Sequence, residues 1–382
     1  MTTAARRRFV PPPYPYDRLD ALRAVADALP GGVVDCSIGT PCDPVPDVVR
    51  DAAAGALAAS MGYPPSAGSP ALRHAAAAWI GRRFDVALDD AQVGVCVGTK
   101  EFVTSLPHLL KLRRPDRDTV LYPAVAYPSY EMGAILAGCR AVAVPLDAQW
   151  HLDFAAIDED DAQRALCVWV NEPGNPTSSV AANEWFGALA EWARARGVTV
   201  ASDECYTEYA TEPTTILSGG TDQMLALHSL SKRSNAAGLR VGFYAGDGDL
   251  VEYLVETRKH VGLMVPTAMQ AAAVAALGDD AHVAQQRARY EERRAVMIDG
   301  LAAHGLVHDG GPMSFYLWLR GADGGAAPDG WDIARRLAAD AGLLVSPGDL
   351  YGAAGAAYAR VALVQPAERL QLALERLDAA SH

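Results

Sequence analysis

The chain has 382 residues, of which 50% are hydrophobic and 21% charged, with a formal net charge of −13 at pH 7. This composition is ordinary for a globular enzyme of one or two domains, and the acidic balance argues against nonspecific binding to nucleic acid or to an anionic membrane. No apolar run approaches the ~20 residues that a membrane-spanning helix needs, so we expect a cytoplasmic protein.

The first 45 residues are rich in proline and are predicted to be irregular. Three arginines at 6–8 precede a segment rich in proline and tyrosine at 11–16, not an apolar stretch, so no secretory signal is predicted. The six cysteines are scattered without a C-x-x-C pair. This arrangement indicates neither a disulfide framework nor a metal site and favours a reducing compartment.

Short apolar runs alternate with helical patterns in the next two hundred residues or so. Strand-like runs occur at 93–97, 120–122, 141–145, 166–170, 198–202, 225–227 and 242–245, and helical patterns such as 101–112 and 184–196 lie between several of them. The alternation predicts an α/β fold with an open, mostly parallel sheet of seven strands between helices. Ligands in such sheets bind beyond the carboxyl ends of the strands.

The last third of the chain predicts a second, smaller α/β region. The pattern is helical from about 248 to 303, with a break at 262–266, and is followed by strand-like runs at 314–319, 343–346 and 360–363, a helix at 331–341 and a final helix. A loop rich in Gly, Ala, Pro and Asp is predicted at 321–330. We therefore expect an arm at 1–45 that joins the small domain, a large domain at 46–265 and a small domain at 266–382.

Lys232 follows the strand-like run 225–227, with Ser229 before it and Arg240 after it. If it is buried near Arg233 and Arg240, its amine has a pKa below the usual value of about 10.4 and is nucleophilic. Such an amine can form a Schiff base with an aldehyde, while Ser229 and Arg240 can hold a phosphate. Pyridoxal 5'-phosphate (PLP) carries both groups. S-x-x-K also occurs by chance and in serine-acylating penicillin-binding proteins, but this chain has no K-T-G partner motif.

Asp203 ends the strand-like run 198–202, and Tyr206 follows three residues later. A bare carboxylate at a buried strand end is costly, so a cationic partner is expected. The protonated ring nitrogen of PLP is a suitable partner, and Tyr206 could reach the phenolate oxygen of the ring. The alternative interpretation is a helix-capping aspartate beside a core tyrosine.

Three further strand ends carry candidate residues, although each signal is common when taken alone. Asn175 lies in the turn after 166–170, and the segment Gly98-Thr99-Lys100 ends a strand and opens a helix whose amides would favour a phosphate. Tyr127 lies just past another strand and could stack on a planar ring. Arg360 starts an apolar strand, where a guanidinium suited to a carboxylate is otherwise poorly explained. Together, five strand ends would supply one PLP site.

With these motifs, the chain resembles the fold-type I, class I and II aminotransferases along nearly its full length. Within them it is most similar to the actinobacterial N-succinyl-LL-diaminopimelate aminotransferases of lysine biosynthesis, in segments 34–44, 126–131, 202–206, 228–235 and 346–352. The resemblance implies amino-group transfer between an amino acid and a 2-oxo acid. It also implies a homodimer with shared active sites.

The resemblance implies a role for each candidate residue. Lys232 would be the Schiff-base lysine, Asp203 the partner of the ring nitrogen, Tyr206 and Asn175 the donors to the phenolate oxygen, and Tyr127 the stacking ring. Ser229, Arg240 and the amides after Gly98, those of Thr99 and Lys100, would hold the phosphate. Tyr63 would reach the phosphate in the neighbouring subunit, and Arg360 with the backbone of Gly39 would bind the substrate α-carboxylate.

Two residues depart from the family pattern. The turn reads Asn175-Pro-Thr-Ser178, where the family usually has N-P-T-G, and Glu172 stands where a small residue is commoner. Ser178 is expected to occupy a glycine-like conformation, and Glu172 to add negative charge near the cofactor. Both changes bear on the substrate, and they keep open a paralogue of secondary metabolism that performs elimination, replacement or bond formation at the substrate.

Two other classes fit the sequence less well. A PLP-sensing transcriptional regulator would carry a DNA-binding helical domain, but only about 45 proline-rich residues precede the fold and the charge is acidic. A nicotinamide-dependent enzyme would carry G-x-G-x-x-G after a strand, which this chain does not.

Overall fold

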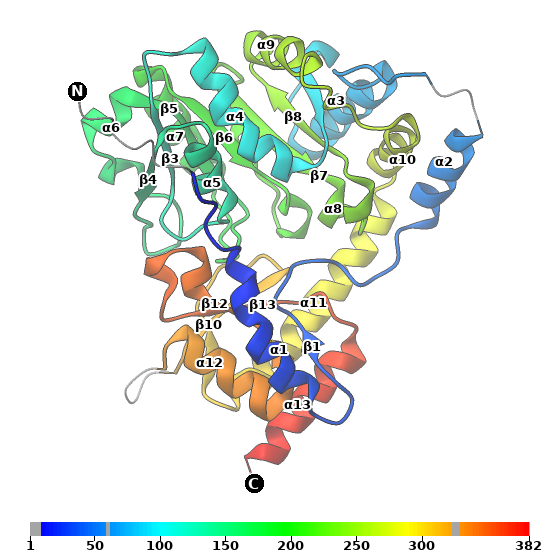
Figure 1. Cartoon of the computed structure of the whole chain (residues 1–382). Helices are drawn as coiled ribbons and strands as arrows, with labels where there is room; N and C mark the ends of the chain where they lie inside the picture. The colour runs from blue at the N-terminus through cyan, green and yellow to red at the C-terminus, as the bar shows by residue number, and fades with distance from the viewer. Residues whose placement is uncertain (1–8, 59–61, 323–327, 382) are drawn as a thin grey trace.

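The computed structural model describes residues 9–58, 62–322 and 328–381. Figure 1 shows a larger part built on one sheet and a smaller part to which both ends of the described chain contribute. The larger sheet has seven strands in the spatial order β2 (Val93–Cys96), β8 (Gly242–Gly246), β7 (Met224–Ser229), β6 (Thr199–Asp203), β5 (Ala165–Asn171), β3 (Thr119–Pro123) and β4 (Arg140–Val144). The predicted α/β fold with seven strands is therefore confirmed.

One strand of this sheet is reversed. β8 is antiparallel to both of its neighbours, β2 and β7, whereas the remaining neighbouring pairs are parallel. As a result, Gly242 at the start of β8 pairs with Cys96 at the end of β2 and with Ser229 at the end of β7. The residues just before β8, which include Arg240, therefore lie at the edge where the other strands end.

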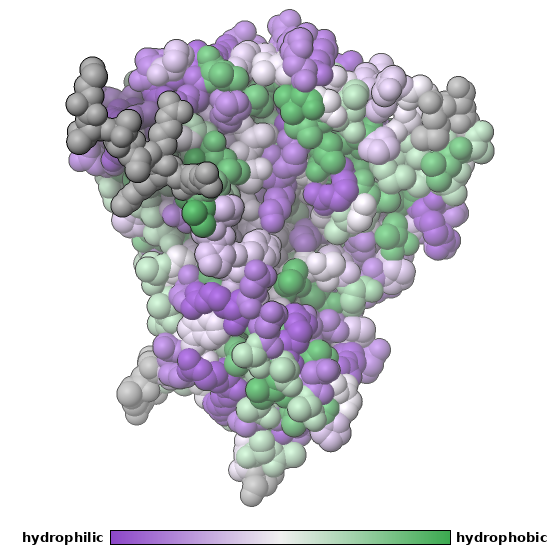
Figure 2. All heavy atoms as spheres, viewed as in Figure 1, coloured by the Kyte–Doolittle hydropathy of each residue, from purple (hydrophilic) through white to green (hydrophobic). Residues whose placement is uncertain are grey.

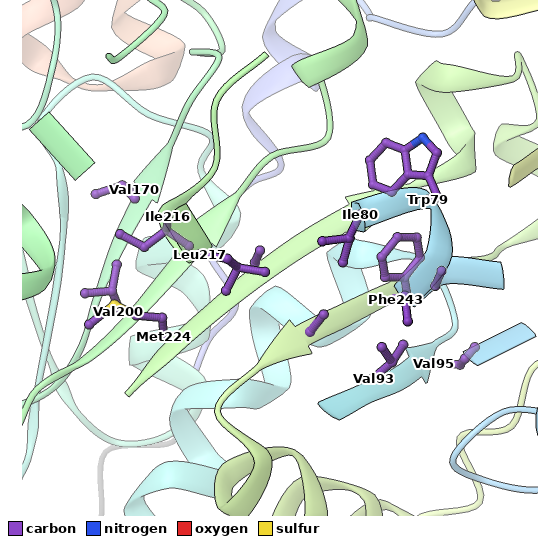
Figure 3. Close-up of a cluster of buried hydrophobic side chains, with 14 of the residues drawn as sticks. Trp79, Ile80, Val93, Val95, Val170, Val200, Ile216, Leu217, Met224 and Phe243 are labelled. Atoms are coloured by element: carbon purple, nitrogen blue, oxygen red, sulfur yellow. The ribbon is translucent and has the colours of Figure 1, made fainter. Parts of the chain in front are cut away.

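Helices cover both faces of the sheet. α3 (Pro70–Phe84), α7 (Asn183–Arg196) and α10 (Thr267–Gly278) share a core with one face, and α4 (Thr99–Arg113), α5 (Ser129–Leu136) and α9 (Gly248–Lys259) share a core with the other. Because side chains alternate along a strand, Met224 and Ala226 of β7 face the first group while Leu225 and Leu227 face the second. Figure 3 shows the first core, with Trp79 near Phe243.

Further helices join or flank these layers. α2 (Asp47–Leu57) packs against α10, α6 (Glu159–Arg164) precedes β5, and the short α8 (Leu230–Arg233) follows β7. Hydrophilic and hydrophobic residues are interspersed on the face that Figure 2 shows. Within the described part of the chain, no helix is both long and apolar enough to cross a membrane.

The smaller part contains an antiparallel sheet and a two-stranded parallel one. The antiparallel sheet has the order β12 (Ser346–Pro347), β13 (Ala359–Ala362), β10 (Tyr316–Gly321) and β9 (Leu306–His308), and β1 (Val34–Asp35) pairs with β11 (Leu343–Leu344). Four helices accompany them: α1 (Asp20–Asp27), α11 (Ala281–Ala302), α12 (Gly330–Arg336) and α13 (Ala367–Ala380). α11 runs from the larger part into the smaller one (Figure 1).

The structure differs from the sequence-based expectations in three places. The first 45 residues were predicted to be irregular, but they contain α1 and β1. The single strand predicted at 343–346 is two strands, because β11 pairs with β1 whereas β12 pairs with β13 in a different sheet. β9 was not predicted. The pairing of β1 with β11 joins Val34 to Leu343, which are far apart in the sequence, and local periodicity does not reveal such a contact.

The division into an arm at 1–45, a large domain at 46–265 and a small domain at 266–382 remains a proposal. α10 follows the proposed boundary but packs against α2 and α3, so a division by packing would fall after α10. The arginine triplet at 6–8 lies outside the described residues, as does the centre of the loop predicted at 321–330.

Candidate active site

A cavity of about 230 Å³ lies at the carboxyl edge of the large sheet, where it meets the small antiparallel sheet. The loops that follow β2, β3, β5, β6 and β7 all contribute to its wall. Eleven of the thirteen candidate residues from the sequence line it: Gly39, Thr99, Lys100, Tyr127, Asn175, Asp203, Tyr206, Ser229, Lys232, Arg240 and Arg360. Strand ends that are far apart in the sequence therefore converge as expected.

Lys232 lies on α8, which begins where β7 ends. Ser229 caps this short helix by accepting a hydrogen bond from the backbone N–H of Ser231 at 3.1 Å. The Lys232 ammonium donates to the carbonyl oxygen of Gly39. Burial lowers the pKa of Lys232 to about 8, and the positive charges of Arg360 and Arg240 act in the same direction.

Arg233, which we expected to act on Lys232, is turned toward a different group. Its Nε donates to Glu208 Oε1 at 3.1 Å, and its Nη1 donates to the carbonyl of Ala276. The guanidinium that contributes most to lowering the pKa of Lys232 is instead that of Arg360.

Asp203 is the last residue of β6, and its carboxylate is buried at the cavity wall. Its Oδ2 accepts a hydrogen bond from the Tyr130 hydroxyl at 2.9 Å, and its Oδ1 accepts one from the Cys205 backbone N–H at 3.2 Å. Burial nonetheless raises the pKa of Asp203. A cation in the cavity would offset this effect. Tyr130 was not singled out from the sequence, although it is three residues from Tyr127.

Tyr206 projects from the turn after β6 and meets the small sheet. Its hydroxyl lies 2.8 Å from the hydroxyl of Tyr316 on β10. A side chain at Gly39 would collide with that Tyr316 hydroxyl, so Gly39 allows the N-terminal segment to pass close to the cavity. Tyr316 is a second lining residue that the sequence did not reveal.

The part of the cavity wall formed by the start of α4 suits a phosphate. Gly98 caps the N-terminus of α4 with φ 75°, which places the amides of Thr99 and Lys100 in the first turn of a fifteen-residue helix. Amides at a helix N-terminus favour an anion. Gly98 does not itself line the cavity, but a Cβ there would collide with the Arg240 guanidinium. Because residue 98 is a glycine, the Arg240 guanidinium can lie beside the N-terminus of α4.

Arg360 and Asn175 form a contact that bridges the two parts of the molecule. Nη1 of Arg360 donates to Asn175 Oδ1 at 2.7 Å, and Nη2 donates to the Ser37 carbonyl at 2.5 Å. The guanidinium lies over the ring of Tyr316, 4.4 Å from its centroid, and near the ring of Tyr351, at 4.8 Å. Its Nε is buried and has no hydrogen-bond partner in the described residues.

Aromatic side chains complete the wall. Tyr127 lies near Lys100, whose ammonium is 5.9 Å from the ring centroid and 5.0 Å from that of Tyr14. Tyr14, Tyr16 and Ile38 also line the cavity. The sequence showed only a proline- and tyrosine-rich segment here, and its place beside Lys100 depends on packing between distant parts of the chain.

Besides Gly98, which lies directly behind the wall, Tyr63 is the candidate residue that does not line this cavity. Its side chain is 96% exposed in the single chain. A role at the cofactor phosphate would therefore require the cavity of another subunit.

Glu172 and Ser178 have different environments. Ser178 has φ 61°, as expected for a residue in a glycine-like position, and its hydroxyl donates to the Tyr316 carbonyl at 2.9 Å. Glu172 does not line the cavity. Its carboxylate pairs with His151 Nδ1 at 2.9 Å, so the negative charge that we expected beside the cofactor lies behind the turn.

The family model for aminotransferase class I and II matches residues 32–377. The chain belongs to this family. It is 41% identical to a probable aminotransferase of Mycobacterium tuberculosis over 96% of this chain and 85% of the relative. It is also 41% identical to the 4-dedimethylamino-4-oxo-anhydrotetracycline transaminase OxyQ of Streptomyces rimosus, over 96% of this chain and 99% of the relative.

Solved structures agree with this assignment. A probable N-succinyldiaminopimelate aminotransferase from Thermus thermophilus superposes with a TM-score of 0.85 at 29% identity, over 96% of this chain and all of that one. The fold is that of the fold-type I aminotransferases, and the protein is a PLP-dependent aminotransferase that acts on amino acids and oxo acids.

The cavity has a donor set that fits PLP. It presents a buried amine with a lowered pKa, a buried carboxylate with no cation in contact among the described residues, and a helix N-terminus beside a guanidinium. These groups suit the aldehyde, the protonated ring nitrogen and the phosphate in turn.

Proposed function

We propose that the enzyme moves the amino group of an α-amino acid to a 2-oxo acid at this cavity. The observation that carries the proposal is the convergence of Lys232, Asp203 and Arg360, from two different sheets, on one buried space. When bound, PLP supplies an aldehyde that exchanges with amines and a ring that accepts the electrons left when the substrate Cα loses its proton.

Three residues around the cavity would have different roles in the reaction. Lys232 would hold the cofactor covalently and, once displaced, accept the Cα proton and return it; with a pKa of about 8 it can do both near neutral pH. Asp203 would keep the ring nitrogen protonated. Arg360, with the backbone of Gly39, would bind the substrate α-carboxylate and so orient the Cα–H bond.

The other candidate residues would hold the cofactor in place. Tyr206 and Asn175 would donate to the phenolate oxygen, and Tyr127 would stack on the ring. Ser229, Arg240 and the amides of Thr99 and Lys100 would bind the phosphate. The exposed Tyr63 would reach the phosphate of a second subunit, which makes the functional unit a homodimer.

For the substrate, N-succinyl-LL-diaminopimelate is the first candidate. The segment resemblances and the likeness to the Thermus thermophilus structure support it. The 41% identity to OxyQ supports a second candidate, an amino transfer to a ketone of secondary metabolism. Glu172 no longer argues against a dicarboxylate donor such as glutamate, because its charge lies outside the cavity wall.

A half-reaction assay tests the proposal. The purified enzyme is incubated with one amino acid at a time and no oxo acid, and conversion of the cofactor to its amino form is followed by absorbance and chromatography. The series contains the twenty common L-amino acids and N-succinyl-LL-diaminopimelate. We expect conversion with at least one of them and none with Lys232→Ala. No conversion with any amino acid, or full turnover by Lys232→Ala, would contradict it.

A second assay separates the two candidate substrates. Enzyme in the amino form is mixed with either the oxo counterpart of N-succinyl-LL-diaminopimelate or 4-dedimethylamino-4-oxo-anhydrotetracycline. A rate at least about a hundredfold higher with one acceptor assigns the enzyme to that substrate class.

A further inference from the structure

The turn between β5 and α7 is buried although it has no regular structure. Each residue from 171 to 179 is buried. Buried irregular backbone needs hydrogen-bond partners that a helix or sheet would otherwise supply. Some come from within the turn: the Gly174 N–H donates to the Ser179 carbonyl, and the Ser178 N–H donates to the Gly174 carbonyl, both at 2.9 Å.

Glu172 ties together the two ends of this turn. Both of its carboxylate oxygens accept from the Ser179 hydroxyl at 3.1 Å, and Oε2 accepts from the Ala181 backbone N–H at 3.1 Å. Its remaining contact is with His151 Nδ1 at 2.9 Å. A carboxylate at the first residue of the turn therefore holds the last residues of the turn and is itself held by an imidazole.

His151 is in turn fixed by its own loop. The Asp147 carboxylate accepts from the backbone N–H groups of Gln149 and His151, both at 2.9 Å. Next to His151, the Trp150 indole donates to the Asp309 carbonyl at 2.8 Å, which reaches the segment between β9 and β10. The contact of Glu172 is therefore with a positioned group.

The middle of the turn carries the contact that orients the carboxylate site. Asn175 receives Arg360 Nη1 at 2.7 Å, while its own backbone N–H donates to Asn171 Oδ1 at 2.8 Å. Beyond Asn175, Ser178 binds the Tyr316 carbonyl. A change in the path of the turn would thus move Asn175 and, through it, the Arg360 guanidinium.

We propose that Glu172, held by His151, is a positioning residue for substrate carboxylate binding: it closes the 171–181 turn so that Asn175 keeps the Arg360 guanidinium in its binding orientation. The proposal rests on the role given to Arg360 above. It assigns a function to the residue that departs from the family pattern, and it predicts a selective effect on carboxylate affinity.

The test compares Glu172→Gln with Glu184→Gln. Gln keeps the size of the side chain but replaces one acceptor by a donor that faces groups which also donate. Glu184 lies on the exposed first turn of α7 and serves as the matched control. The probes are the amino acid with the highest kcat/KM in the half-reaction series and the carboxylic acid that lacks only its amino group, as 3-phenylpropanoate does for L-phenylalanine.

For Glu172→Gln we expect the KM of the amino acid and the Ki of the carboxylic acid to rise together by about tenfold, the effect of a displaced hydrogen bond to a charged group. The kcat at saturation and the Kd for PLP should stay within about twofold of wild type, as should all four values for Glu184→Gln. Ser179→Ala, which keeps the Glu172 charge but removes one hydroxyl donor to it, should raise KM and Ki less. Ser179→Ala also provides the test of the proposal if Glu172→Gln does not fold.

Unchanged KM and Ki in both Glu172→Gln and Ser179→Ala would overturn the proposal, as would a weaker affinity for PLP that accompanies any rise in KM. Arg360→Lys identifies the source of a failure. If that variant binds both probes normally, the carboxylate site has been wrongly placed and the proposal falls with it. If Arg360→Lys raises both constants and Glu172→Gln does not, only the positioning role is wrong.

Discussion

The protonation of Lys232 makes cofactor attachment depend on pH in a specific range. Only the neutral amine can attack an aldehyde, and the pKa of this amine is about 8 because the side chain is buried near Arg360 and Arg240. The neutral fraction therefore rises as the pH increases through 8 and is nearly complete above 9.

We predict that the rate at which the apo enzyme binds PLP covalently increases from pH 6.5 to about 9 and then reaches a plateau. Stopped-flow absorbance at constant ionic strength measures it. An ordinary exposed lysine has a pKa of about 10.4, so a rate that continues to rise steeply up to pH 10 would show that Lys232 is not in the environment described. Replacing the exposed Lys259 by Ala serves as the control and should leave the profile unchanged.

Asp203 and Tyr130 should have unequal effects on the reaction. Asp203→Asn removes the charge that we propose faces the ring nitrogen, and we predict that kcat falls by at least about a hundredfold, as for loss of a preorganised electrostatic partner. Tyr130→Phe removes only one donor to the carboxylate, so a fall of about tenfold or less is expected. Steady-state kinetics with saturating substrates compare the two. Equal losses would mean that the carboxylate acts only through the Tyr130 hydrogen bond.

The site residues that the sequence predicted share a simple relation to the sheet. Asn175, Asp203 and Lys232 follow strands whose ends meet at one edge, so recognising the strands was sufficient to bring them together. Tyr130 and Tyr316 reach the cavity from a helix and from the second sheet. Their contacts depend on how distant segments pack, for which a single sequence holds no local signal.

At the scale of elements, α4 and α9 are joined by two ion pairs of very different burial. Arg258 is 1% exposed and donates to both Glu101 oxygens, at 2.7 and 2.8 Å, whereas Arg113 and Asp249 pair near the surface. Because Glu101 also accepts from the Val97 N–H at 3.3 Å, the buried pair supports the loop before the N-terminus of α4, the proposed phosphate site.

We predict that Arg258→Met lowers the free energy of unfolding by about 3 kcal/mol, because the Glu101 carboxylate loses its buried partner. Arg113→Met, between the same two helices, should cost less than about 1 kcal/mol. Urea unfolding followed by fluorescence compares the two variants. Similar losses for both would indicate that burial does not determine the strength of these pairs.

Strand positions were predictable because strands appear in the sequence as short alternating or continuous apolar runs. The seven strands of the large sheet lie within two residues of the predicted starts and ends, and α4 and α7 lie where helical periodicity placed them. Strand order and direction were not predictable in the same way. The reversal of β8 and the pairing of β1 with β11 result from long-range packing.

For the whole molecule, the exposed Tyr63 leads to a test of shared active sites. The single variants Lys232→Ala and Tyr63→Ala should each have little activity. The first lacks the amine, and the second lacks the proposed contact with the phosphate. After they are unfolded together and refolded, random pairing in a two-fold dimer gives intact sites that amount to about a quarter of the wild-type number. We predict recovery of about that share of activity. Activity no greater than the sum of the separate variants would contradict shared sites.

The hydrogen bond from Arg360 to the Ser37 carbonyl joins residues that are 323 positions apart in the chain. The candidate cofactor-binding residues from Thr99 to Arg240, in contrast, come from one continuous stretch between β2 and β8. Contacts between distant positions form late when a polypeptide refolds, because long loops must close first. During refolding, the absorbance of the bound cofactor should therefore appear before the enzyme regains its affinity for the substrate carboxylate.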